Sequence, residues 1–316
     1  MKYIFFFLTF STYKMAVPVF RLLAERPDFQ ALVSDMLERS GLSEQDVSSL
    51  LRTPQGALRM DIFGEFAKCF VPQFVDASDN YELYEFMGDS AVNKATISYL
   101  YRKLSKRLAA SRNRQALGYL DKIKSTCVST PFLADICTQL GFDTFLDWVI
   151  RHNQGGYDIK KEKNYREDIV EAFFGCMEVH IDTLYMYRGY CFVSNIIVDI
   201  LENIHINYHP DRIWTPWILL KETNDAICSA AKQTGAKLYT YTVSKYGDGY
   251  AIYTTPCNSA IRPTPVLELG TISDSKSVAE DTLAKIALDY LATIREYIPL
   301  VRHPPTPVEL GIADLM

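Results

Sequence analysis

The chain has 316 residues, of which 48 per cent are apolar and 22 per cent charged, so it can bury a large core and is not a disordered chain. Lysine and arginine number 33 against 38 aspartate and glutamate, a formal charge of −5, which excludes a protein coated all over with positive charge. The seven cysteines contain no Cys-x-x-Cys pair, which argues against a disulfide scaffold or a thiolate zinc site and favours a reducing compartment. We therefore expect an intracellular, cytoplasmic protein.

Residues 1–56 are expected to form an N-terminal helical extension. Ile4 to Phe10 form an apolar run that is short for a signal peptide and lacks an Ala-x-Ala cleavage site. This run is either a buried apolar arm or an extension upstream of a start at Met15. From Pro18 to Leu51 the apolar residues follow helical spacing. No stretch has the roughly 20 consecutive apolar residues that a membrane span requires, so no membrane partner is expected.

Residues 57–204 predict an all-helical domain, because no alternating strand pattern occurs before residue 210. The expected helices cover Met60–Phe70, Tyr81 to beyond Tyr101, Lys106–Ser125, Thr130–Leu140, Thr144–His152 and Tyr165–Met186.

The remainder predicts a linker, a small mixed domain and a tail. Residues 205–216 break the helical periodicity with prolines and aromatics and are expected to be a linker. His205 and His209 stand four apart there, a spacing that could share a metal, but without an acidic or thiolate partner the linker interpretation is favoured. Residues 217–297 predict an α-β-β-β-α module, and residues 298–316, rich in proline, a flexible tail. The expected elements of the α-β-β-β-α module are a helix over Leu219–Lys232, strands over Lys237–Val243, Tyr250–Thr255 and Val266–Thr271, and a helix over Ser273–Leu291.

The most informative segment is Tyr81-Glu-Leu-Tyr-Glu-Phe-Met-Gly-Asp-Ser-Ala-Val-Asn93. On a helix, Glu82, Glu85 and Asp89 project from one face, where their mutual repulsion costs a few tenths of a kcal/mol per pair unless cations resolve it. The glycine at position 88 costs about 1 kcal/mol relative to alanine within a helix, which suggests that another backbone or a ligand approaches it closely. A solvated helix face, with Glu82 in a capping box begun by Asp79, explains the spacing alone equally well.

A second acidic pair favours a site. Asp168 and Glu171 stand three apart in Asp168-Ile-Val-Glu-Ala-Phe-Phe-Gly175 and again precede a glycine. The two segments together point to a cluster of carboxylates that holds a cation.

These segments resemble the two signature motifs of the ribonuclease III family. Glu82-Leu-Tyr-Glu-Phe-Met-Gly-Asp-Ser90 is similar to the motif E-R-L-E-F-L-G-D-A/S, and Asp168 to Gly175 is similar to D-x-x-E-A-x-x-G. The form of the first motif is closer to homologues from large DNA viruses or unicellular eukaryotes than to the compact bacterial enzymes. The resemblance implies an all-α nuclease domain that acts as a homodimer on double-stranded RNA, in the host cytoplasm if the chain is viral.

The resemblance also implies the site and its chemistry. Glu85, Asp89, Asp168 and Glu171 match the catalytic, metal-binding carboxylates of the family, and Glu82 matches an accessory acid. The implied cofactor is Mg²⁺, with Mn²⁺ as a substitute, and the implied reaction is hydrolysis of phosphodiester bonds to 5′-phosphate ends and short 3′ overhangs.

Two departures keep an alternative open. Leu83 stands where the family usually has arginine, and the segment before the signature lacks the family's T-H-x-S pattern. The alternative is a non-catalytic double-stranded-RNA-binding or ribonucleoprotein scaffold protein of the same superfamily, against which the four intact acids speak.

Two regions are candidates for RNA contact. Residues 102–124 carry eight basic residues against the single acid Asp121, and we expect Arg107, Arg112 and Arg114 to contact phosphates. The C-terminal module resembles a double-stranded-RNA-binding domain in element order. It keeps one lysine, Lys276, where that family opens its last helix with several, so contact with a protein or support of a dimer is nearly as well favoured as RNA binding.

Overall fold

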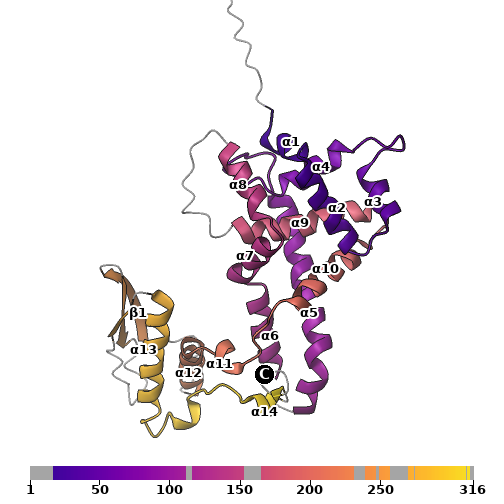
Figure 1. Cartoon of the computed structure of the whole chain (residues 1–316). Helices are drawn as coiled ribbons and strands as arrows, with labels where there is room; N and C mark the ends of the chain where they lie inside the picture. The colour runs from indigo at the N-terminus through magenta and orange to yellow at the C-terminus, as the bar shows by residue number, and fades with distance from the viewer. Residues whose placement is uncertain are drawn as a thin grey trace, which may run out of the picture. The chain divides into compact units, whose positions relative to one another are not determined.

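A computed structural model describes residues 17–111, 116–152, 165–230, 239–246, 249–256, 270–273, 275–310 and 312–313 (Figure 1). The expectations for residues 1–16 and for Arg112 and Arg114 therefore lie outside the described residues. The chain divides into two compact units, the first made of residues up to 100 and 124–205 and the second of residues 101–123 and 206 onward. Helix α5 (Glu82–Ser111) and helix α6 (Ala116–Cys127) each contribute residues to both units.

The first unit is helical apart from one isolated β-bridge between Arg52 and Leu58, as far as its residues are described. This confirms the prediction of an all-α domain. Besides parts of α5 and α6 it contains α1 (Val19–Ala24), α2 (Pro27–Arg39), α3 (Glu44–Leu51), α4 (Met60–Lys68), α7 (Thr130–Gln139), α8 (Asp143–His152), α9 (Tyr165–Asp182) and α10 (Gly189–Asn203).

Local signals in the sequence explain where several helices begin and end. Pro27 occupies the first turn of α2, where its missing N–H is not needed. The next residue but one after α2, Gly41, has φ of 97°, the left-handed conformation that commonly ends a helix. Helix α3 begins with a capping box in which Ser43 and Asp46 satisfy each other's backbone N–H groups.

Helix α9 is the central element of the first unit (Figure 1). Every residue from Ile169 to Met177 is buried, as expected for a helix that is apolar on nearly all sides. Phe173 packs against Phe66, Phe70 and Phe142 with ring centroids 5.2, 6.1 and 4.7 Å apart. The single charged side chain in this buried stretch is Glu171. Burial on this scale holds the second motif rigidly in place.

The second unit contains a three-stranded antiparallel sheet in the order β1-β2-β3, with β1 Tyr239–Tyr246, β2 Gly249–Pro256 and β3 Gly270–Ser273. Helix α12 (Pro216–Ala230) precedes the sheet, and α13 (Lys276–Leu291) follows it and packs against β2, β3 and α12. The α-β-β-β-α order is therefore present. The third strand extends to Ser273, two residues beyond the predicted end, and the last helix begins at Lys276 rather than at Ser273. Residues 266–269 lie outside the described part.

The segment expected to be a linker has a buried core of its own. It contains α11 (Pro210–Ile213), and Trp214 stacks on Tyr119 with ring centroids 5.8 Å apart. The hydroxyl of Tyr119 donates a hydrogen bond to the carbonyl of Tyr208 over 2.6 Å. His209 accepts a hydrogen bond from the backbone N–H of Asp211 and so serves as a helix cap rather than as part of a metal site. The aromatic residues that break the helical periodicity here are core residues of the second unit.

The stretch after α13 is also more ordered than predicted. It contains a 3₁₀ turn, η2 (Ile298–Leu300), and a short helix, α14 (Pro307–Leu310). Val301 packs into the apolar cluster of α12 and α13, and Leu310 and Ile312 are fully buried. No described helix has the length and apolar character that crossing a bilayer demands.

Candidate metal centre

The first motif begins at a well-defined helix start. Asn80 accepts a hydrogen bond from the N–H of Glu82 over 3.0 Å, and the carbonyl of Tyr81 accepts from the N–H of Glu85 over 2.9 Å. Asp79 forms an ion pair with Lys68 at 3.0 Å. The capping residue is therefore Asn80 rather than Asp79, and Glu82 is left exposed at the start of α5.

Helices α5 and α9 touch backbone to backbone at the two motif glycines. A Cβ atom on Gly88 would overlap the carbonyl oxygen of Glu171, and one on Gly175 would overlap the carbonyl oxygen of Tyr84. This confirms the prediction that another backbone approaches Gly88. The close approach brings the carboxylates of the two motifs together.

Three acidic side chains converge beside this helix contact. Glu85, Asp168 and Glu171 each offer a carboxylate oxygen, and these oxygens lie within 4.8 Å of one another. Glu171 is buried, with 6 per cent of its surface exposed, while Glu85 and Asp168 are half-buried. They line an open hollow that also includes Glu82, Phe86, Asp89 and Glu167.

The electrostatics of the cluster favour a cation. Burial, together with the nearby carboxylates of Asp168, Glu82, Asp89 and Glu167, raises the pKa of Glu85 to about 7. Burial and the surrounding acids raise the pKa of Glu171 to about 8. Burial also raises the pKa of Asp168. None of the lysine and arginine side chains that the structure describes pairs with these three acids, so a bound cation would supply the missing positive charge.

Asp168 has a hydrogen-bond partner from the other motif segment. The hydroxyl of Tyr81 donates to Asp168 Oδ2 over 2.7 Å, and this bond opposes the effect of burial on the pKa of Asp168. No pattern in the sequence marks Tyr81 as a site residue. Its position directly before the signature was the available signal, but no spacing rule connects it with a residue 87 positions later.

The other predicted acids lie at the edge of the cluster. Asp89 is exposed and accepts a hydrogen bond from Asn93 Nδ2 over 2.7 Å. It lines the same hollow as the three acids but is not among those whose oxygens converge within 4.8 Å, and neither is Glu82. Glu167 also lines the hollow and contributes to the raised pKa values of Glu85 and Glu171. It was not among the acids predicted from the sequence.

The predicted RNA-binding residues belong to the second unit. Arg107 is half-buried on α5, whereas its neighbours Arg102 and Lys106 are exposed. Lys276 is exposed in the first turn of α13, where it lies 3.5 Å from Glu280.

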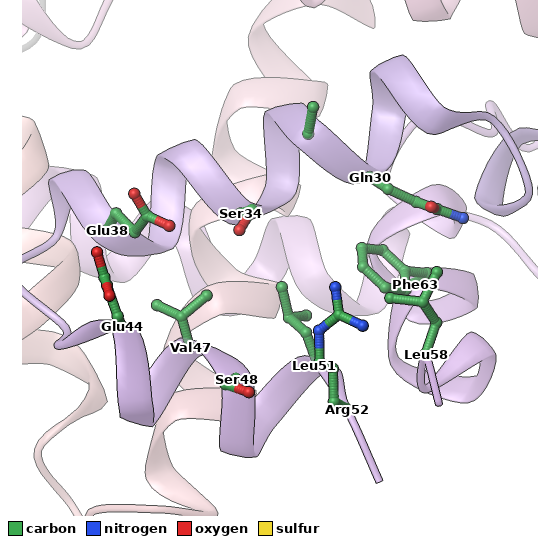
Figure 2. Close-up of a pocket in the computed structure, with 11 residues that line it drawn as sticks. Gln30, Ser34, Glu38, Glu44, Val47, Ser48, Leu51, Arg52, Leu58 and Phe63 are labelled. Atoms are coloured by element: carbon green, nitrogen blue, oxygen red, sulfur yellow. The ribbon is translucent and has the colours of Figure 1, made fainter. Parts of the chain in front are cut away.

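A second hollow in the first unit lacks comparable chemistry (Figure 2). It lies between α2 and α3, with Val47, Leu51 and Phe63 as its apolar lining, Glu38 and Glu44 facing each other at one end and Arg52 towards the other. Its side chains do not include three converging ligands, which among the described residues occur only at the cluster of Glu85, Asp168 and Glu171.

Two helices that touch at glycines and gather three carboxylates define the class of helical proteins with an oxygen-ligand site that could hold a divalent cation. The chain matches the ribonuclease III domain over residues 82–180. This stretch is a divergent ribonuclease III domain, the domain that defines a family of endoribonucleases.

Several known proteins are similar to this chain. A protein of Invertebrate iridescent virus 6, assigned by inference as a ribonuclease 3, is 24 per cent identical over 84 per cent of this chain and 87 per cent of its own length. The ribonuclease 3 of Borreliella afzelii is 24 per cent identical over 40 per cent of this chain, and that of Delftia acidovorans 27 per cent identical over 42 per cent. The matches span about half of each bacterial protein, 44 and 51 per cent. A solved structure of Dicer from Pichia stipitis is 22 per cent identical, covering 71 per cent of this chain and 91 per cent of that one with a TM-score of 0.30.

Proposed function

We propose that this protein is a Mg²⁺-dependent endoribonuclease that hydrolyses phosphodiester bonds in double-stranded RNA. The observation that carries the proposal is the convergence of Glu85, Asp168 and Glu171 where the two motif helices touch. Mg²⁺ prefers oxygen ligands and is usually held by a few carboxylates together with water and phosphate. Mn²⁺ has the same ligand preference and is expected to substitute.

The residues of the cluster have distinct parts in this proposal. Glu85, Asp168 and Glu171 are the side chains that would hold the ion, Asp89 completes the set of ligands from the rim of the hollow, and Glu82 is an accessory acid. When bound, the ion activates water and stabilises the leaving oxygen. The raised pKa values of Glu85 and Glu171 mean that both carboxyls hold protons readily in the free protein, so metal binding at neutral pH releases protons.

We also propose that the active form is a homodimer. Leu83 and Phe86 on α5 are 74 and 75 per cent exposed, and Phe86 lines the acidic hollow. Met87 and Ile97 on the same helix are 38 and 53 per cent exposed. Large apolar side chains at this exposure favour burial by a partner, and a second copy with its own acidic cluster accounts for one cut in each strand, with 5′-phosphate ends and short 3′ overhangs.

RNA contact is assigned to exposed basic residues of the second unit. Arg102 and Lys106 stand four apart on α5 and therefore share a face that can follow phosphates. We further propose that the α-β-β-β-α module resembles a double-stranded-RNA-binding domain in function as well as in element order, with Lys276 as a phosphate contact. The free thiols and the viral relative favour action in the cytoplasm, a host's if the chain is viral.

The test is cleavage of a long labelled RNA duplex in Mg²⁺. The decisive variant is Glu171→Gln, and its matched control is Glu178→Gln, because Glu178 lies on the same helix, is half-buried and also has a raised pKa but is not part of the hollow. We expect wild type and Glu178→Gln to cut. Glu171→Gln should lose more in rate than the roughly 10–100-fold that the loss of a residue supporting a metal ligand costs, because it removes a ligand itself. Ca²⁺ in place of Mg²⁺ should support binding without cleavage.

One outcome would reverse the proposal in favour of the scaffold alternative. If wild type binds the duplex, forms a dimer and leaves the RNA intact in both Mg²⁺ and Mn²⁺, the protein is a non-catalytic RNA-binding member of the superfamily.

A further inference from the structure

Tyr81 is the one neutral side chain for which the structure records a hydrogen bond to the acidic cluster, within the residues it describes. Its hydroxyl donates to Asp168 Oδ2 over 2.7 Å, and the residue as a whole is 5 per cent exposed. The residue stands directly before α5. The bond therefore links the start of the first motif helix to an acid of the second.

The donor is held in place from several directions. The N–H of Tyr81 donates to the carbonyl of Val71 over 3.2 Å, and its own carbonyl accepts the first hydrogen bond into α5. Its ring lies 6.5 Å from that of Tyr165, which in turn packs against Phe74 at 5.4 Å. A hydroxyl on a ring fixed in this way is preorganised for its acceptor, because little conformational freedom remains to be lost.

The bond constrains what Asp168 can offer to a cation. A phenol has one proton to donate, and Tyr81 donates it to Oδ2 of Asp168. This hydrogen bond restrains the orientation of the carboxylate and does not engage Oδ1. Ligating carboxylates that are themselves hydrogen-bonded bind metals more tightly than unsupported ones, typically by a factor of about 10–100.

We propose that Tyr81 is a positioning residue that orients Asp168 for a divalent cation. It touches neither RNA nor the ion in this scheme and acts only through Asp168. The inference rests on the proposed function, since it concerns the same cluster, but it is tested by metal affinity and not by cleavage alone.

Tyr84, three residues further along the chain and within α5, provides a matched control. Its hydroxyl donates to Glu65 Oε2 over 2.8 Å, and its ring is half-buried, but Glu65 belongs to α4 and takes no part in the cluster. Tyr81→Phe and Tyr84→Phe thus each remove one phenol-to-carboxylate hydrogen bond and keep the ring. Similar melting temperatures for the two variants would show that the fold is equally intact in both.

The experiment measures Mn²⁺ binding by electron paramagnetic resonance, with Mg²⁺ as competitor. We expect Tyr81→Phe to weaken Mn²⁺ binding about 10-fold and to raise the Mg²⁺ concentration for half-maximal cleavage by a similar factor, with the rate at saturating Mg²⁺ changed only a few-fold. Tyr84→Phe should bind Mn²⁺ as wild type does. In an Asp168→Asn background, Tyr81→Phe should cause no further loss of affinity, because the group it positions is gone.

Unchanged Mn²⁺ affinity in Tyr81→Phe overturns the inference, as does an equal loss in both tyrosine variants or an undiminished effect in the Asp168→Asn background. Absence of Mn²⁺ binding by wild type overturns it as well. If wild type binds Mn²⁺ but does not cut duplex RNA, the proposed nuclease function fails, while the comparison of the two tyrosines still decides the role of Tyr81.

Discussion

At the scale of single residues, the buried carboxylates of the acidic cluster lower the stability of the folded protein when no cation balances their charge. Glu171 lies in the buried stretch of α9 beside other acids, and the residue is 6 per cent exposed. Removing a carboxylate from water without a balancing cation is unfavourable, and the raised pKa values of Glu85 and Glu171 express that cost.

The raised pKa values of Glu85 and Glu171 predict that the metal-free protein is more stable in mild acid than in mild alkali. The folded-state pKa values of about 7 for Glu85 and about 8 for Glu171 lie above the usual value of 4.5, so the folded state binds more protons than the unfolded state between those limits. The stability present below pH 4.5 is therefore lost as the pH rises through 7 to 8. We expect the melting temperature in EDTA to fall by several degrees between about pH 5.5 and 8.5, since about 1 kcal/mol corresponds to roughly 2–4 °C in a protein of about 150–250 residues.

Glu171→Gln provides the internal comparison for this pH scan. The amide cannot ionise, so the variant should show a smaller fall in melting temperature and be more stable than wild type at pH 8.5 in EDTA. Saturating Mg²⁺ should stabilise wild type more at pH 8.5 than at pH 5.5. A melting temperature that rises with pH in EDTA would contradict the burial of uncompensated carboxylates.

At the scale of secondary-structure elements, the contact between α5 and α9 determines whether the site exists. The two helices approach so closely at Gly88 and Gly175 that neither position has room for a Cβ atom. Each of the clashing atoms belongs to a backbone, which cannot turn aside as a flexible side chain can. The glycines are needed for closeness rather than for an unusual backbone conformation.

Gly88→Ala should therefore force α5 and α9 apart. We expect a loss of about 3 kcal/mol or more in the free energy of unfolding, at the upper end of the range for overpacking, together with weakened Mn²⁺ binding. Gly118→Ala is the matched control, because Gly118 lies within α6, is exposed, and has no atom within 4 Å of the added Cβ. That substitution should stabilise the protein by about 0.5–1 kcal/mol through helix propensity. Urea unfolding of both variants measures the difference, and equal effects would be inconsistent with the close contact.

The elements also show how far sequence patterns reach. The all-α unit could be predicted because helices follow from the local spacing of apolar residues. The close approach at the site could be predicted because a glycine at position 88 is unfavourable within a helix unless another group lies near it. The bond between Tyr81 and Asp168 was out of reach, because it joins residues 87 positions apart and depends on how the helices pack. Residues 205–216 were predicted as a linker for a related reason: a pattern broken by proline and aromatics does not reveal that Trp214 is buried against Tyr119.

At the scale of the whole molecule, the exposed apolar side chains of α5 predict self-association. Leu83→Asp with Phe86→Asp should convert a dimer to a monomer, because a buried interface cannot accept unpaired carboxylates. The control is Leu117→Asp, since Leu117 is 78 per cent exposed on α6 but far from the first motif in sequence. Sedimentation velocity should show a fall in mass for the double variant only. A double variant that stays dimeric would place the interface elsewhere.

The charge distribution predicts how strongly RNA binding depends on salt. The chain is acidic as a whole, so any affinity for duplex RNA must come from local basic groups that displace counterions from phosphates. Arg102 and Lys106 are exposed on one face of α5, whereas Lys276 stands alone in the first turn of α13 with Glu280 at 3.5 Å. Arg102→Gln and Lys106→Gln should each lower the slope of log K against log salt by about 0.7–0.9, with an affinity loss that is the same for different duplex sequences.

Lys276→Gln tests whether the C-terminal module also binds RNA. If this variant produces a similar change in slope, the module also contacts phosphate. If it leaves the slope unchanged while the α5 variants reduce it, RNA is held by α5 and the module is free to contact protein.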